Sequence, residues 1–268
     1  MKLTKRTLRG GFPPMFVGVM FVCPIVSWMA AFLRSISFKA TDFALTKTAL
    51  VNSHWLAFIT AVSCLVLSFP LALSEPFLPP RLRPLLWSII FGPVCVGMLP
   101  RNFAWQGMLS GRELTSSMGW SIGGLGPRIL YTDYAVVLVM AFVFLPFAFF
   151  VLSLGTAIIR PIHIEAARVA GASSGQIARR IFLPVLAESA VIAFFLIYCS
   201  SLGYFITPAM IGSNAKTFAG TLITKLINLS DFSFGSIAGL LLLLSSMPSV
   251  VGFLWLATRR RSVLSWKG

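Results

Sequence analysis

The side chains that most often carry out chemistry in proteins are scarce and scattered in this sequence. Its 268 residues include 2 His, 4 Cys and 7 acidic residues. His54 and His163 lie far apart and the cysteines form no C-x-x-C pair, so neither a metal site nor a disulfide framework is indicated. No triad arrangement of Ser and acidic residues is evident, and no G-x-x-x-x-G-K-[ST] loop offers a nucleotide site. We therefore expect no catalytic residues, no metal and no cofactor, and an enzyme is a poor interpretation.

One polar stretch, residues 165–184, stands out from an otherwise apolar chain and reads EAARVAGASSGQIARRIFLP. Pro161 suits the first position of a helix, where its missing N–H leaves no bond unmade. Glu165 comes early in that helix, where negative charge favours the helix dipole. Ala166 and Ala167 are strong helix formers of minimal bulk, so this helix offers a flat surface on which another protein could pack.

The same stretch carries signals for a turn and a second helix. Gly171 is placed where a helix would end in a left-handed residue. Ser173, followed three positions later by Gln176, matches a capping box that restarts a helix. Pro184 then begins a long apolar helix. The sequence predicts a folded helix–turn–helix here rather than a slack loop.

The composition of the chain indicates that a membrane surrounds it. Hydrophobic residues make up 57% of the sequence and charged residues 11%, with a mean hydropathy of +0.89. A soluble domain of ordinary composition is about 25% charged. The chain has too few charged residues to cover the surface of a soluble protein of this size. Lipid must therefore surround part of its surface.

Long uncharged windows separate the charged residues, and a membrane-spanning helix needs about 20 mainly apolar residues. The windows run 10–33, 48–74, 84–100, 134–159, 189–215 and 232–258. The third is short, but it can continue past Arg101, whose side chain would then snorkel to a membrane face. We expect an all-α membrane protein with six transmembrane helices, at about 12–34, 49–73, 85–106, 131–156, 184–210 and 234–257.

The basic residues fix the expected orientation. The net charge is +15, and most Lys and Arg residues fall in segments on one side, namely the N-terminus, 75–83, 157–183 and the C-terminus. The positive-inside rule places these segments, and both termini, in the cytoplasm. The basic clusters therefore indicate topology and lipid headgroups rather than nucleic acid. The N-terminal apolar run is too long for a signal peptide, so we expect it to be retained as the first helix.

Seven positions of the polar stretch match the EAA motif of ABC-importer permeases, the membrane subunits of binding-protein-dependent uptake systems. They are Glu165, Ala166, Ala167, Gly171, Ile181, Leu183 and Pro184. The resemblance implies a type I ABC importer permease fold, a single domain over 1–268 with its core at about 50–257. It also implies that the cytoplasmic loop 157–183 is a coupling element that docks on an ATPase. Val169 stands where many members carry Asp, which puts one polar contact, though not the docking, in question.

A second resemblance concerns the solute. The segment 202–212, LGYFITPAMIG, together with the residues at 220–223 and 234–236, resembles the spermidine/putrescine branch of these permeases, whose relatives also carry opines and aminophosphonates. The family implies an ABC ATPase dimer, a second permease subunit and a periplasmic solute-binding protein as partners in a bacterial inner membrane. Homodimeric and heterodimeric pairing of permeases both stay open.

A polyamine pathway would need carboxylates to neutralise ammonium groups and aromatic faces for cation–π contact. The candidates are Trp105, Asp133, Tyr198, Tyr204 and Asp231. Aromatic residues in a membrane protein also serve as interface belts and packing, so these assignments compete with a purely structural role.

The alternative function is a stand-alone secondary carrier driven by an ion gradient. Such carriers usually have more spans, inverted repeats and a buried ionisable residue. No acidic residue lies in the middle of an expected span, which weighs against ion coupling.

Overall fold

A computed structural model describes residues 40–110, 130–159, 161–213, 216–229 and 232–264, and within these ranges the chain is helical with no strand. The elements, in chain order, are α2 (Ala40–Ser74), η1 (Glu75–Phe77), α3 (Leu82–Cys95), α4 (Met98–Ser110), α7 (Asp133–Ala157), α8 (Pro161–Val169), α9 (Ser174–Ile177), η2 (Ala178–Phe182), α10 (Leu183–Leu202), α11 (Ile206–Ile211), α12 (Ala219–Asn228) and α13 (Phe232–Leu264).

Among the described residues, 4 helical segments are long and apolar enough to cross a membrane, and up to 5 if α3 and α4 together form one span. These segments are Ala44–Phe77, Asp133–Ala157, Ser174–Leu202 and Phe234–Gly252. They correspond to the second, fourth, fifth and sixth predicted helices. The first predicted helix, 12–34, lies outside the described residues.

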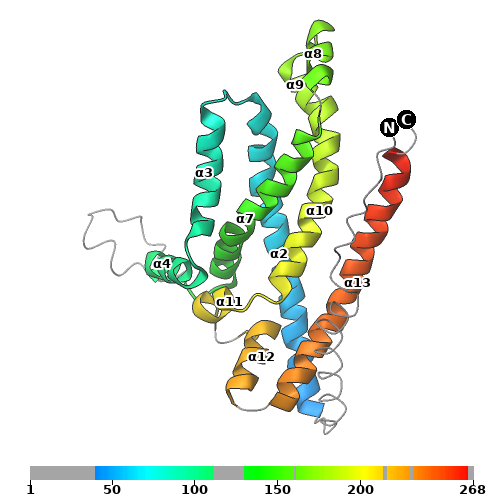
Figure 1. Cartoon of the computed structure of the whole chain (residues 1–268). Coiled ribbons are helices and arrows are strands. Elements are labelled where there is room, and N and C mark those ends of the chain that lie inside the picture. Colours follow the sequence, from blue (N-terminus) through cyan, green and yellow to red (C-terminus); the bar gives the residue numbers. More distant parts are fainter. Residues whose placement is uncertain (1–39, 111–129, 160, 214–215, 230–231, 265–268) are drawn as a thin grey trace, which may run out of the picture.

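Three long helices form the centre of the molecule. Helices α2, α7 and α10 pack against one another, and Figure 1 shows them side by side with α3 and α13 flanking them. Helix α7 is the most buried span, with 61% of its apolar window inside the protein. Its buried positions therefore surround the helix rather than form one stripe, as expected for a helix enclosed by others.

The core divides into two clusters along α7. The first surrounds Met140 and Phe144 and includes residues of α2, α10 and α11. The second surrounds Phe149 and Leu152 and joins the ends of α2 and α3 to Phe182 and α10. The second cluster lies beside the predicted coupling loop, so that loop is anchored to the packed core.

The third predicted span, 85–106, is not one continuous helix, because α3 and α4 meet at a bend of 100°. Pro93, Gly97 and Pro100 surround the break at Val96, and prolines remove helical hydrogen bonds while Gly permits the turn. The prediction that Arg101 snorkels to a membrane face is wrong. Its side chain is only 9% exposed, and its guanidinium donates a hydrogen bond to the Pro93 carbonyl across the break, at 3.1 Å.

The fifth predicted span, 184–210, also ends earlier than expected. Helix α10 stops at Leu202, Gly203 follows it, and the short α11 continues as a separate element. The segment 211–233, between the fifth and sixth predicted spans, contains α12. The second predicted span in turn begins earlier, because α2 starts at Ala40. Charge boundaries locate the apolar segments but do not resolve these breaks and ends.

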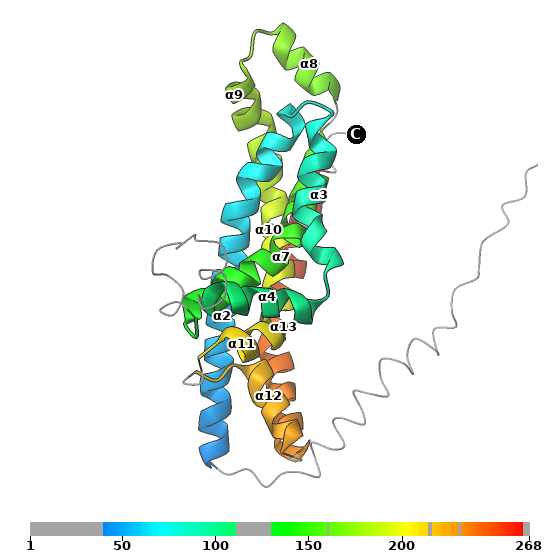
Figure 2. The same cartoon turned by 90° about the vertical axis from the view of Figure 1, so that its left-hand side faces the viewer.

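The two ends of the molecule differ in composition. Helices α8 and α9 cap one end, close to the turn between α2 and α3, whereas α12 and the start of α2 lie at the other end (Figure 2). The end with α8 collects Arg81, Arg83, Arg168, Arg179 and Arg180. This is the end that the positive-inside rule assigns to the cytoplasm.

Candidate functional site: the helix–turn–helix before the fifth span

The predicted conformation of the polar stretch is confirmed. Helix α8 begins at Pro161, and its C-terminus closes at Gly171, whose φ is +79°. The Ala172 N–H donates to the Ala167 carbonyl and the Gly171 N–H to the Arg168 carbonyl, both at 2.9 Å. This pair of bonds is a Schellman motif, which satisfies carbonyls that the helix end leaves free.

The second helix starts with the predicted capping box. The Gln176 N–H donates to the Ser173 hydroxyl at 3.4 Å, and the Ser173 N–H donates to the Gln176 side-chain oxygen at 2.9 Å. Helix α9 therefore has a defined beginning at Ser174, five positions after Val169, the last residue of α8. The helix–turn–helix therefore has a fixed shape.

A π-helical turn, η2, joins α9 to α10 and was not predicted. Pro184 has no N–H to donate to the carbonyl four residues earlier, so the regular ladder cannot continue through it. The Leu183 N–H instead bonds the Ala178 carbonyl, five residues back. Single π turns interrupt α-helices frequently at functional sites.

Part of the exposed surface of α8 is an apolar stripe. Ile162, Ala166 and Val169 follow a spacing of four and three residues, which places them on one face of a helix. All three are exposed, with Ile162 at 63% and Val169 at 90%. Contiguous exposed apolar patches, especially those rimmed by polar residues, mark sites of contact with other proteins or with membranes. Val169, the departure from the usual motif, extends this stripe.

The motif residues do not all face outward. Glu165, Ala166, Gly171, Leu183 and Pro184 are exposed. The other two, Ala167 and Ile181, are partly buried against the second core cluster.

Two of the details expected for α8 are wrong. Because Ala167 faces the core, the alanine pair does not form one outward surface. Glu165 lies in the second turn of α8, so it is beyond the first turn, where the helix dipole acts.

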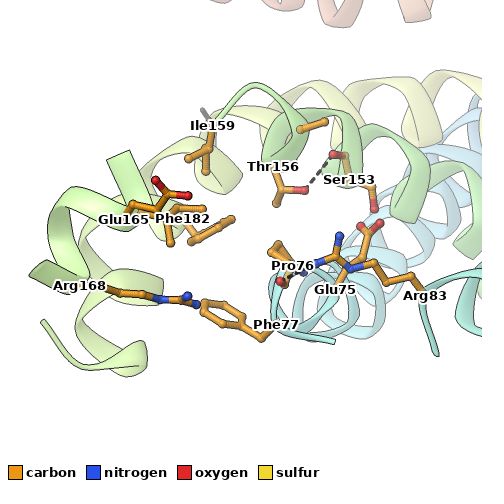
Figure 3. A pocket seen from close by; sticks show the side chains of 12 residues that line it. Glu75, Pro76, Phe77, Arg83, Ser153, Thr156, Ile159, Glu165, Arg168 and Phe182 are labelled. Carbon is orange, nitrogen blue, oxygen red and sulfur yellow. Dashed lines mark hydrogen bonds between the residues drawn. The ribbon is translucent and has the colours of Figure 1, made fainter. Parts of the chain in front are cut away.

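An aromatic contact joins the turn after α2 to this loop, and a polar contact joins the same turn to α3. The rings of Phe77 and Phe182 lie 5.4 Å apart between centroids. The Trp87 indole N–H donates to Glu75 Oε1 at 2.8 Å, which fixes η1 against α3. A pocket of about 410 Å³ opens between η1, the end of α7 and α8. Figure 3 places Glu165 and Arg168 on one side of this pocket and Glu75 and Ser153 on the other.

The predicted pathway residues are spread over several elements. Asp133, at the start of α7, forms an ion pair with Lys216 and lines a pocket of about 910 Å³ between α2 and α7. Tyr198 of α10 shares a 2.6 Å hydrogen bond with His54 of α2 and lines another pocket, of about 610 Å³. The structure therefore does not bring Asp133 and Tyr198 into one cavity.

The remaining pathway candidates lie in or near the first core cluster. Trp105 of α4 packs edge-on against Phe142, with 5.1 Å between ring centroids. Tyr204 packs edge-on against Phe144, with 5.5 Å between centroids. The Tyr204 hydroxyl is buried with no hydrogen-bond partner in the described structure. Asp231 lies outside the described residues.

A buried polar contact near the broken span was missed by sequence reasoning. The Thr207 hydroxyl of α11 donates to Asn102 Oδ1 of α4 at 2.7 Å, and both side chains are fully buried. The Asn102 amide also donates to the Met98 carbonyl. The signal in the sequence is the polar pair Arg101-Asn102, directly after the uncharged window 84–100 and inside the predicted span 85–106. Among the described residues, no group of three or more His, Cys, Asp or Glu could hold a metal ion.

A family profile described as "Binding-protein-dependent transport system inner membrane component" matches residues 84–261. The spermidine/putrescine transport system permease protein PotB of Salmonella typhimurium is 28% identical over 213 residues, covering 78% of this chain and 74% of that protein. PotB of Escherichia coli is 27% identical over 218 residues, covering 80% and 78%. The osmoprotective compounds uptake permease protein GgtC of Synechocystis sp. is 26% identical over 234 residues, covering 82% of each.

Solved structures share the fold. A chain of a bacterial alginate ABC transporter, crystallised in complex with an alginate pentasaccharide-bound periplasmic protein, superposes with a TM-score of 0.74 at 15% identity. The superposition covers 93% of this chain and 92% of that one.

Proposed function

This chain belongs to the family of binding-protein-dependent transport system inner membrane components, and we propose that it is the subunit through which an ATPase drives uptake of a small organic amine. It is a multi-pass permease of an ABC importer. The finer proposals concern its coupling residues, its partners and its solute.

The apolar stripe on α8 is the observation that carries the coupling proposal. Ile162, Ala166 and Val169 expose apolar surface at the end of the molecule that is rich in Arg. Covering water-exposed apolar surface with a partner contributes about 25 cal/mol of favourable binding free energy per Å². The Schellman turn and the capping box fix the angle between α8 and α9. A displacement of a docked ATPase would therefore be transmitted to α10 with little deformation of the loop.

Some residues of the EAA motif are exposed and others are partly buried, and this difference supports the coupling role. Exposed Glu165, Gly171 and Leu183 are available to the ATPase, while Ala167 and Ile181 hold the loop to the core. This end would then face the cytoplasm, with both termini on the same side. The chemistry of ATP hydrolysis belongs to the partner, and this chain converts its motion into alternating access.

The partners follow from the same family. We propose an ABC ATPase dimer at α8 and α9, a second permease subunit that completes the pathway, and a periplasmic solute-binding protein at the opposite end, all in a bacterial inner membrane. An alginate importer chain of the same fold was crystallised with its periplasmic protein, which supports the last of these.

A polyamine is the solute that the similarities favour. The relatives named PotB are spermidine/putrescine permeases, and they match along about three quarters of this chain. Within the protein, Trp105, Asp133, Tyr198, Tyr204 and Asp231 remain the proposed pathway residues. The Asp133–Lys216 ion pair could act as an outer gate, since an arriving ammonium group would compete with Lys216 for the carboxylate.

Reconstitution tests the proposal. The permease is purified from its own host with its bound subunits and placed in liposomes with the solute-binding protein. We expect an ATPase to co-purify and radiolabelled putrescine or spermidine to accumulate only with ATP. Uptake by the chain alone, driven by an ion gradient without ATP, would favour the stand-alone carrier instead.

A further inference from the structure

The pocket below α8 holds polar atoms that the fold itself does not satisfy. Ser153 of α7 is 5% exposed, and its hydroxyl has no hydrogen-bond partner among the described residues. Glu75 Oε2 is also buried without a partner, although Oε1 of the same carboxyl accepts from Trp87. Both residues line the same pocket of about 410 Å³. A buried carboxylate oxygen without a donor is costly, so a bound group that donates hydrogen bonds would stabilise this site.

Two carboxylates and two guanidinium groups line the pocket, and the buried Glu75 Oε2 atom has no donor among the described residues. Glu75 and Glu165 lie on opposite sides of it in Figure 3, so each side presents one carboxylate. The Arg83 guanidinium keeps its positive charge, but it directs N–H groups at the carbonyls of Pro76 and Leu78, at 2.8 and 3.1 Å, and Glu75 Oε2 is left without a donor. Arg168 is exposed and lies beside Phe77 at the edge of the pocket (Figure 3).

The walls of the pocket suit an alkyl chain between two charged ends. Phe77, Phe182 and Ile159 supply apolar surface between the two carboxylates. Aromatic faces also attract ammonium groups, especially where water is partly excluded. An anionic ligand could contact Arg83 and Arg168, but it would offer no donor to the buried Glu75 Oε2 atom.

We infer that this pocket is a binding site for a small organic diamine, with one ammonium group at Glu75 and Ser153 and the other at Glu165. The site is separate from the transmembrane pathway residues. The inference rests on the proposed function in one respect, namely that this end of the molecule faces the cytoplasm, where imported amine accumulates.

Occupancy of the pocket has a consequence for turnover. A diamine bound there would bridge η1 and the end of α7 to α8, which belongs to the proposed coupling loop. It would therefore stabilise one position of α8 and oppose the movement that transport requires. Product amine would slow its own import at a site in the permease.

The direct test is putrescine binding to the full-length permease in lipid nanodiscs, measured by isothermal titration calorimetry. We expect Glu75→Gln to weaken binding about tenfold or more, because it replaces a charge-assisted contact while an amide oxygen still accepts from Trp87. Ser153→Ala should weaken it about threefold to tenfold. Glu188→Gln is the matched control, since it removes the same charge from the start of α10 without touching the pocket, and it should leave the affinity unchanged.

Three results would overturn the inference: no putrescine binding, equal affinities in the unchanged chain and in both pocket variants, or preferential binding of the dianion succinate. Putrescine inhibition of ATP turnover in the assembled complex should disappear in Glu75→Gln at the same time. If ATP hydrolysis by the complex drives uptake but putrescine does not bind in this pocket, the proposed binding site is wrong and the proposed function stands. If no ATPase joins the permease, the proposed function fails, and the nanodisc titration still decides the site.

Discussion

Phe77, in the turn that follows α2, packs its ring against that of Phe182, at the junction of the proposed coupling loop and α10, with 5.4 Å between centroids. Phe182 is buried at 1% exposure, whereas Phe77 is 39% exposed. The contact joins two segments that lie far apart in the sequence. It gives α8 and α9 a mechanical connection to α2 and α3 as well as their covalent connection to α7 and α10.

Replacing Phe77 with Ala should loosen that connection. An aromatic pair contributes about 0.5–1.5 kcal/mol beyond its buried area. We expect the solute transported per ATP hydrolysed to fall several-fold, because part of the loop motion no longer reaches α2. The measurement is the ratio of uptake to ATP turnover in proteoliposomes. Phe77→Leu, which keeps apolar volume, should retain most of the coupling, and an unchanged ratio in Phe77→Ala would contradict the transmission role.

Gly171→Ala separates backbone conformation from side-chain contact. A Cβ on Gly171 would meet no atom within 4 Å, but its φ of +79° is strained for Ala by about 1–2 kcal/mol. Gly175→Ala is the control, since it adds the same methyl group in open space within α9. We expect uptake to fall in Gly171→Ala and to remain in Gly175→Ala. Equal uptake in the two variants would show that the turn geometry does not matter.

Gly155→Ala should destabilise the crossing of α7 and α10. A Cβ on Gly155 would lie 1.9 Å from the Ser189 hydroxyl and 2.8 Å from Ser189 Cβ, so the helices must move apart. Overpacking of this kind costs about 1–3 kcal/mol. The thermal unfolding midpoint in detergent should drop, and Ser189→Gly in the same chain should restore part of it. Gly92→Ala, which meets nothing within 4 Å, should leave the midpoint unaffected.

The Asn102–Thr207 bond should matter for the stability of the broken span. Thr207→Val keeps the shape of the side chain but leaves Asn102 Oδ1 buried without its donor. An unsatisfied buried acceptor costs about 1–3 kcal/mol. We expect a lower unfolding midpoint in Thr207→Val and little change in Thr207→Ser, which keeps the hydroxyl. A midpoint equal to that of the unchanged protein would mean that another donor, such as water, replaces Thr207.

Much of the fold could be predicted because two strong signals act locally. Uncharged windows locate spans, since a charge inside hydrocarbon is costly. Cap residues locate the loop helices, since Gly171 and Ser173 satisfy backbone groups within a few positions. These signals predicted the helix–turn–helix correctly.

The sequence could not settle features that depend on tertiary packing. The break between α3 and α4 needs α11 beside it, because Asn102 and Thr207 satisfy each other only across that contact. Likewise, whether Ala167 faces a partner or the core depends on the second core cluster. The pathway candidates were chosen by chemical type alone, and the structure pairs Asp133 with Lys216 and Tyr198 with His54.

The central claim is that α8 passes motion from an ATPase to the membrane helices, and a charge reversal at Glu165 tests it most directly. Glu165 is exposed on α8, so Glu165→Lys changes the docking surface without disturbing the core. The measurement is ATP turnover stimulated by the solute-loaded binding protein, made beside uptake in the same proteoliposomes. We predict that Glu165→Lys abolishes both the stimulation and the uptake in a complex that still contains folded permease, with Glu165→Gln intermediate. Full solute-stimulated turnover and full uptake in Glu165→Lys would contradict the account.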